Sequence, residues 1–101
     1  MGGKMNTTID KNQWVFIAIQ DPGKNEQIAG LHDKKNNTYF IPAFLKKHEA
    51  AECFLNLPRE SGKKYEVHAI TFEELVNYAL KNGFLIFILD KEGKILEKIS
   101  P

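Results

Sequence analysis

Apolar side chains occur along the chain in short blocks separated by polar turn residues. Residues 14–19 are rich in β-branched and aromatic side chains and precede Asp21-Pro22-Gly23, so they predict a buried strand ending in a tight turn. Residues 27–32 and 38–41 flank five polar residues, the pattern of two antiparallel strands joined by a longer hairpin loop. Pro42 cannot donate to a sheet ladder, so we expect it where the third strand ends or at an edge.

The middle of the chain predicts two helices with a strand between them. Residues 46–57 place apolar side chains at helical intervals and end before Pro58. Residues 64–70 alternate between two kinds of side chain with a period of two, which predicts a fourth strand. In the sequence Thr71-Phe72-Glu73-Glu74 the threonine can accept a hydrogen bond from the amide of Glu74, whose side chain reaches back, so a helix begins there. Asn82-Gly83 supplies the left-handed residue that ends it.

The last two strands complete the predicted fold. Residues 84–89 are apolar on both faces, which is typical of a central strand, and the turn at residues 90–93 leads into a final strand at residues 94–99. Strand-helix-strand passages join parallel strands and hairpins join antiparallel ones. We therefore expect an α+β fold in the order β-β-β-α-β-α-β-β, with a mixed sheet of five to six strands. Residues 14–19 and 84–89 should be central, and both helices should cover one face.

Composition adds limits rather than an activity. The chain has 101 residues, of which 43% are hydrophobic and 27% are charged, values typical of one soluble domain. We expect residues 13–101 to form this domain and residues 1–12 to be a flexible tail. The polar N-terminus does not resemble a signal peptide and no apolar run is long enough to span a membrane, so a cytoplasmic protein is expected. The net charge of +1 gives no global field that would attract nucleic acid or anionic lipid.

No motif in the sequence predicts a catalytic, cofactor or metal site. His32, His48 and His68 are far apart and lack partners at the spacing of zinc ligands. Cys53 has glutamates beside it, which would raise its pKa, so a structural thiol is the preferred interpretation. The glycines are isolated, and neither a dinucleotide fingerprint nor a phosphate loop is present. The acidic pair Glu73-Glu74 is explained by its place in the first turn of a helix.

Three lysine pairs could contact nucleic acid only if folding gathered them beside Tyr39 or Phe40. These pairs are Lys34-Lys35, Lys46-Lys47 and Lys63-Lys64. Each pair has acidic residues nearby, and solvated surface is the preferred interpretation, so nucleic acid is not an expected partner.

Residues 37–44, Asn-Thr-Tyr-Phe-Ile-Pro-Ala-Phe, lead into Lys46-Lys47-His48-Glu49-Ala50-Ala51. This passage resembles the SseB N-terminal domain family, in which a strand of the form Tyr-Ile-Pro-Ala-Phe enters a helix with Glu-Ala in its first turn. The later segments Val67 to Leu75 and Gly83 to Ile86 are similar to that family's next strand, helix and strand, so the resemblance covers residues 14–99. It implies a compact bacterial α+β domain without established catalytic residues, in proteins linked by name to serine sensitivity and secretion.

Two functions from different classes remain open at this point. The first is a noncatalytic protein-interaction or regulatory module, in which an exposed strand edge at residues 94–99 or 27–32 pairs with a partner protein or a second copy of the chain. The second is a small-molecule-binding domain or small enzyme. Its pocket would lie near the strand ends and use His68, Glu66 or Cys53. The apolar residues are accounted for by a core, and no polar constellation suits chemistry, so the first is preferred.

Overall fold

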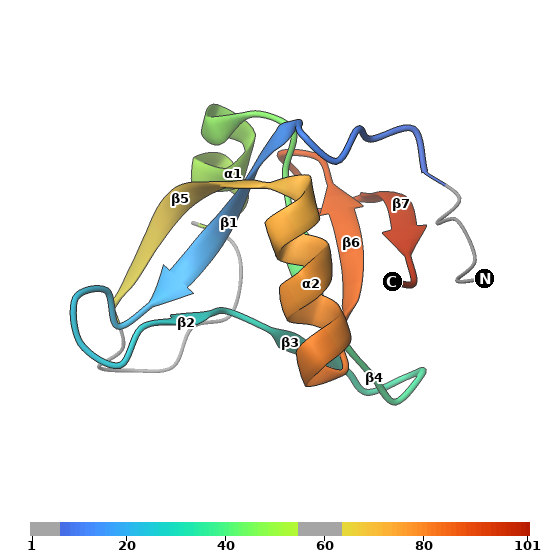
Figure 1. Cartoon of the computed structure of the whole chain (residues 1–101), viewed down its shortest axis with the longest axis horizontal. Helices are drawn as coiled ribbons and strands as arrows, with labels where there is room; N and C mark the ends of the chain where they lie inside the picture. The colour runs from blue at the N-terminus through green and yellow to red at the C-terminus, as the bar shows by residue number, and fades with distance from the viewer. Residues whose placement is uncertain (1–6, 55–63) are drawn as a thin grey trace.

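The computed structural model describes residues 7–54 and 64–101 of the chain (Figure 1). Within these ranges the elements follow one another as four strands, a helix, a strand, a helix and two strands. They are β1 (Trp14–Gln20), β2 (Gln27–Ile28), β3 (Leu31–Asp33), β4 (Thr38–Ala43), α1 (Lys47–Phe54), β5 (Tyr65–Thr71), α2 (Phe72–Asn82), β6 (Leu85–Leu89) and β7 (Ile95–Ile99). The α+β class is therefore confirmed, with one more strand than the predicted six.

The strands form two sheets, one of three strands in the order β2-β1-β5 and one of four strands in the order β3-β4-β6-β7. Strands β4 and β6 are parallel, and the other neighbours are antiparallel. The predicted mixed pairing is confirmed. The central positions expected for residues 14–19 and 84–89 are also confirmed, because β1 and β6 each have a strand on both sides.

Among the described residues, an isolated backbone bridge between Phe16 and Phe44 joins the two sheets. The backbone N–H of Phe16 donates to the carbonyl of Phe44, and the N–H of Phe44 donates to the carbonyl of Phe16, both at 2.9 Å. The sequence predicted a single sheet, whereas the structure has two, which are joined at this junction between β1 and the end of β4 (Figure 1).

The segment predicted as one strand at residues 27–32 divides between the sheets. Ile28 pairs with Ile19 of β1, whereas Leu31 pairs with Phe40 of β4. The chain crosses over at Gly30, where an added Cβ would lie 2.5 Å from the Phe84 ring. A residue without a side chain is needed there because the backbone passes so close to that ring.

The helices pack on opposite sides of the strands, and the expectation that both would cover one face is wrong (Figure 1). The α2-side cluster includes Val15, Ile17, Phe72, Leu75, Ile86 and Ile88. The α1-side cluster is Phe44, Ala50, Cys53, Phe87 and Leu89, with Phe16, Phe40, Val67 and Leu85 packed against it. Consecutive residues of a strand point to opposite faces, so strands that are apolar on both faces need cover on both.

Helix α2 begins and ends as the sequence predicts. The Thr71 hydroxyl accepts from the N–H of Glu74, and Gly83 adopts a left-handed conformation with φ of 77°. The N–H groups of Phe72 and Glu73, which have no partner inside the helix, donate to the carbonyls of Gln13 and Lys11 at 2.8 and 2.9 Å. The segment that precedes β1 therefore helps to cap α2.

Part of that preceding segment also contributes to the core. Ile9 is buried in the α2-side cluster. Residues 7–12 of the predicted tail thus touch the fold, and residues 1–6 lie outside the described residues.

Candidate functional site

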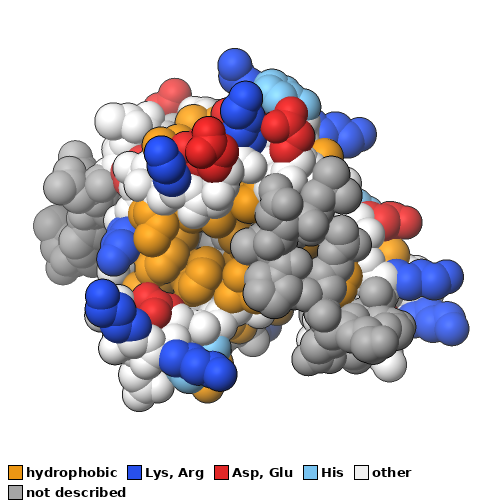
Figure 2. All heavy atoms as spheres, turned by 180° about the vertical axis from the view of Figure 1, so that it is seen from behind, with side chains coloured by type: hydrophobic (Ala, Val, Ile, Leu, Met, Phe, Trp, Pro, Cys, Tyr) orange, Lys and Arg blue, Asp and Glu red, His pale blue; other side chains and the backbone are white. Residues whose placement is uncertain are grey.

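An apolar groove of about 500 Å³ opens on the α1 side of the four-stranded sheet. Its apolar lining comes from one residue or more of each strand: Leu31, Phe40, Phe87, Leu89 and Ile95. The rings of Phe40 and Phe87 stack with their centroids 4.3 Å apart and form the floor. In the view from behind, Figure 2 shows hydrophobic side chains gathered in a continuous patch with lysine side chains around it.

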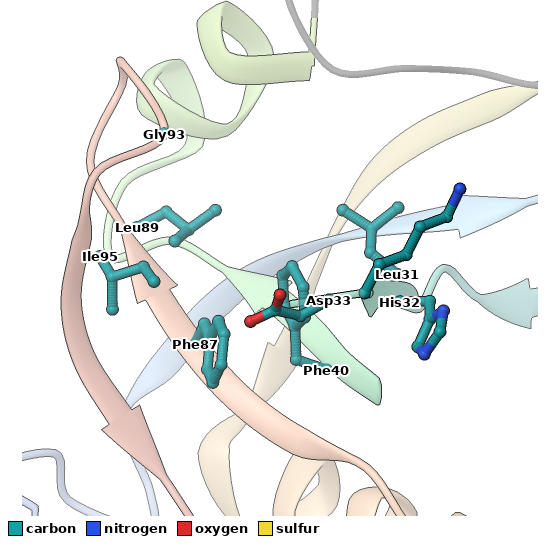
Figure 3. A pocket seen from close by; sticks show the side chains of 9 residues that line it. Leu31, His32, Asp33, Phe40, Phe87, Leu89, Gly93 and Ile95 are labelled. Carbon is teal, nitrogen blue, oxygen red and sulfur yellow. The ribbon is translucent and has the colours of Figure 1, made fainter. Parts of the chain in front are cut away.

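Both edge segments singled out in the sequence contribute to this groove. Strands β3 and β7 are the outer strands of the four-stranded sheet, and they supply Leu31 at one margin and Ile95 at the other. The β3 margin is polar, because His32, Asp33 and Lys34 line it. Figure 3 shows Asp33 directed from β3 toward the rings of Phe40 and Phe87.

The Asp33 carboxylate is held in place by its own turn. One oxygen accepts from the N–H of Lys35 at 3.1 Å and of Asn36 at 3.4 Å, and the other accepts from the Asn36 side-chain amide at 2.9 Å. The hydrogen bond from the Asn36 side chain is the main cause that lowers the pKa of Asp33, so the group is ionised at neutral pH. Its hydrogen-bonding capacity is largely used within the turn.

Lys98 of β7 provides a positive charge directly above the groove floor. It pairs with Phe87 across the β6 and β7 ladder, and its Nζ lies 5.4 Å from the centroid of the Phe87 ring. Its charge is also the smallest of the causes that lower the pKa of Asp33. The groove therefore combines an aromatic floor with a lysine from β7 and a carboxylate from β3 that interact through their charges.

Strand β7 extends the apolar surface beyond the groove. The side chains of Ile95 and Leu96 are 47% and 59% exposed. The ladder shifts register at this point, with Ile95 opposite Leu89 and Glu97 opposite Ile88, so Leu96 is an extra residue in a bulge. The bulge turns Ile95 toward the groove.

The structure does not bring together the three residues considered for catalysis. His68 and Glu66 form a contact of 2.9 Å on β5, and both side chains are substantially exposed. Cys53 belongs to the α1-side cluster with Val67, and alternation along β5 directs Glu66 and His68 to the opposite face. The sheet thus separates the thiol from the histidine and the carboxylate.

Cys53 has the environment of a structural thiol. It is buried beside Gly93, where an added Cβ would lie 3.6 Å from its sulfur. Burial, with a smaller contribution from the Asp90 carboxylate, raises the pKa of Cys53. A raised pKa keeps the thiol protonated and unreactive at neutral pH.

The remaining polar motifs have structural explanations. His32 stacks on Tyr39 at 4.4 Å between ring centroids and contacts Asn37, on the face opposite Phe40. Asp90 accepts two backbone N–H bonds, from Glu92 and Lys94, and so closes the β6 to β7 turn. In residues 7–54 and 64–101, no three His, Cys, Asp or Glu side chains are placed to hold a metal ion.

The lysine pairs lie in different parts of the fold. Lys34 and Lys35 are in the turn between β3 and β4, whereas Lys46 and Lys47 are at the start of α1. Lys63 lies outside the described residues. Figure 2 shows lysine side chains spread around the periphery of this face rather than gathered beside one aromatic residue.

Sequence reasoning did not locate the groove, although one signal for it was present. Leu85, Phe87 and Leu89 form an apolar row on β6. This row of alternate residues indicates a second apolar face of β6, but it does not indicate which part of that face borders a groove.

Comparison of the chain with models of protein families, with curated proteins and with solved structures gives no match. No helix among the described residues is both long and apolar enough to cross a membrane.

Proposed function

We propose that this chain is a noncatalytic protein-interaction module that binds a segment of a partner protein in the apolar groove. The observation that carries this proposal is the groove itself: an aromatic floor of Phe40 and Phe87 that continues into the exposed side chains of Ile95 and Leu96. Exposed apolar surface with a polar rim is characteristic of interaction sites.

The neighbourhood of β7 supports a macromolecular partner over a small ligand. Leu96 lies in the bulge outside the groove, so the apolar surface is broader than the cavity and suits a chain that passes over the strand. Interaction modules of this kind obtain specificity from side-chain pockets along an extended segment. The cavity volume of about 500 Å³ also lies in the range of about 300–1,000 Å³ for small-molecule sites, which keeps ligand binding as the second candidate.

The proposal that the module is noncatalytic is supported by the separation of Cys53 from His68 and Glu66. Acid-base or nucleophilic catalysis needs such groups within hydrogen-bonding reach of one another or of a common substrate atom. We assign no cofactor to the chain. We also propose a cytoplasmic location and membership of the SseB N-terminal domain family. The resemblance to that family rests on residues 37–51, Val67 to Leu75 and Gly83 to Ile86.

A matched pair of surface substitutions tests the interaction site. Ile95→Glu places a charge at the groove, whereas Leu80→Glu places the same charge at a similarly exposed leucine on α2, on the other face. The tagged chain and both variants are used to recover partners from a lysate of the source organism. We expect a stoichiometric partner that the Ile95 variant loses and the Leu80 variant keeps.

Thermal shift with a metabolite panel distinguishes the second candidate. A ligand at a hundred times its dissociation constant should stabilise the protein by about 2.7 kcal/mol. A metabolite that stabilises the wild type, but not the Ile95 variant, would replace the protein-interaction proposal with ligand binding.

A further inference from the structure

We propose that two copies of this chain dimerise by pairing their β5 strands antiparallel, with Val67 opposite Val67 of the other copy. The two three-stranded sheets would then join into one sheet in the order β2-β1-β5-β5-β1-β2. None of the β5 residues lines the groove, so this inference concerns a second surface and does not rest on the proposed function. It is carried by the outward-pointing backbone groups of β5 and by the order of its side chains.

Strand β5 is the most regular edge among the described residues, and it lies at the outer side of its sheet (Figure 1). The other outer strands are β2 and β3, which have only two and three residues, and β7, which a bulge interrupts. Strand β5 runs for seven residues in unbroken register with β1, and it contains neither lysine nor proline. Short length, bulges, lysine and proline are features that protect an edge from pairing, and β5 has none of these four.

The hydrogen bonds of β1 show which backbone groups of β5 point outward. Phe16 exchanges its backbone hydrogen bonds with Phe44, so these groups do not bond to Ala69, the β5 residue opposite Phe16. Ala69 therefore belongs to a non-hydrogen-bonded pair, and its N–H and C=O point away from β1. This orientation recurs at every second residue, so Val67 and Tyr65 share it. Within the described residues, no backbone group outside β5 bonds to these outward groups.

The phase of these groups limits the ways in which β5 can pair with itself. A two-fold axis places one residue opposite its own copy, and the outward groups of the two strands must face each other. With Val67 on the axis, Tyr65 of each copy faces Ala69 of the other. The Val67 pair and both Tyr65–Ala69 pairs would each exchange two hydrogen bonds, as hydrogen-bonded antiparallel pairs do.

The side chains favour this register over its neighbours. Each Glu66 carboxylate would lie opposite the His68 imidazole of the other copy, in addition to its own 2.9 Å contact with His68. On the other face, the Tyr65 ring would lie across Ala69, which is exposed in the single chain. An axis at Glu66 would instead set two carboxylates opposite each other, and an axis at His68 would leave Glu66 opposite Ile70. Like charges directly opposite are destabilising, whereas complementary pairs stabilise a sheet.

Sedimentation equilibrium with charge variants tests the inference. His68→Glu places carboxylates opposite each other, and Glu66→Lys removes the carboxylate that His68 faces, so each variant alone should dimerise poorly. In a mixture of the two variants, every facing pair again joins a carboxylate to a lysine or an imidazole, so a heterodimer should form. Glu97→Lys is the control, because it makes the same charge change on an outer strand of the other sheet.

A backbone variant tests the edge separately. Ala69→Pro removes an outward N–H that makes no hydrogen bond within the described fold, so circular dichroism should show a folded chain. Its dimer would lack two hydrogen bonds, each contributing a factor of about five, so the dissociation constant should rise about 25-fold. The charge variants test the same contact if this substitution disturbs the strand. Ile95→Glu, in the groove, should dimerise like the wild type.

We expect a concentration-dependent dimer of the wild type and of Glu97→Lys, and a dissociation constant at least about tenfold higher for each single charge variant. A wild type that stays monomeric at millimolar concentration would overturn the inference. Single variants that are both weakened but are not restored by mixing would reject the register with Val67 on the axis. A dimer that only Ile95→Glu abolishes would place the contact at the groove instead. Partner binding in the groove has its own test, so it can fail while the dimer stands.

Discussion

Replacing Gly30 with alanine tests the close packing where the chain passes from β2 to β3. The new Cβ would lie 2.5 Å from Cε1 and 2.9 Å from Cζ of Phe84. Carbon atoms in contact are normally about 3.5–4.0 Å apart, so the ring would have to retreat by about 1 Å. Phe84 cannot do this freely, because it packs against the α2-side cluster and stacks on Tyr78.

The expected change in the free energy of unfolding follows from two opposing effects. Overpacking costs about 1–3 kcal/mol. Gly30 is not in the left-handed region, so alanine also gains about 0.4–1 kcal/mol by restricting the unfolded chain. We therefore expect Gly30→Ala to destabilise the protein by about 1–2 kcal/mol, measured by urea unfolding followed by circular dichroism.

A double-mutant cycle identifies the ring as the cause. Phe84→Leu removes Cε1 and Cζ, the two ring atoms nearest the new Cβ, so Gly30→Ala should be neutral or stabilising in that background. The same cost in both backgrounds, or a stabilising effect of the single substitution, would refute the argument that Phe84 requires glycine at this position.

Three further predictions concern α2, Cys53 and Asp33. Thr71→Ala should remove the N-cap hydrogen bond from the N–H of Glu74 and lower the free energy of unfolding by about 1 kcal/mol. Gly83→Val should lower it further, because the φ of 77° at this position is unfavourable for a β-branched residue. Urea unfolding checks both substitutions, and partner binding by the folded protein should be unchanged. Cys53 should react with a thiol reagent at neutral pH only as fast as the chain opens, since burial raises its pKa; rapid labelling of the native protein would contradict this. The pKa of Asp33 is lowered in the folded protein, so its stabilising contribution is present above the ordinary value of 3.8 and is lost as the pH falls through the lower folded value. The difference between the urea midpoints at pH 6 and pH 3 should therefore be smaller for Asp33→Asn than for the wild type. An equal difference would show that this carboxylate does not contribute to stability.

The elements that could be predicted from the sequence are those whose signals are local. Helix α2 is the clearest example, because Thr71 and Gly83 act through bonds to residues within one helical turn. The division of residues 27–32 between two sheets had no such signal, and the close approach of the Phe84 ring to Gly30 exists only in the folded chain. The apolar character of residues 84–89 was recognised, but which helix covers which face depends on the path of the chain between the sheets.

The candidate groove could not be predicted from the sequence for a related reason. Its lining alternates with core residues along four strands, and only the order β3-β4-β6-β7 places these alternate residues side by side. The sequence suggested both margins as strand edges without showing that they border one surface. Lys98 over Phe87 likewise follows from a cross-strand register that no local pattern specifies.

The order in which the strands join the two sheets has a consequence for how the chain reaches this fold. Going along the sequence, the strands enter the first sheet twice, the second sheet twice, the first sheet once more and then the second sheet again. Neither sheet is encoded by a continuous stretch of chain, so any segment that holds all the strands of one sheet also holds strands of the other. We therefore expect the domain to unfold in a single cooperative transition and to refold slowly for its size, because the pairs β1-β5 and β4-β6, one in each sheet, must close long loops before they form.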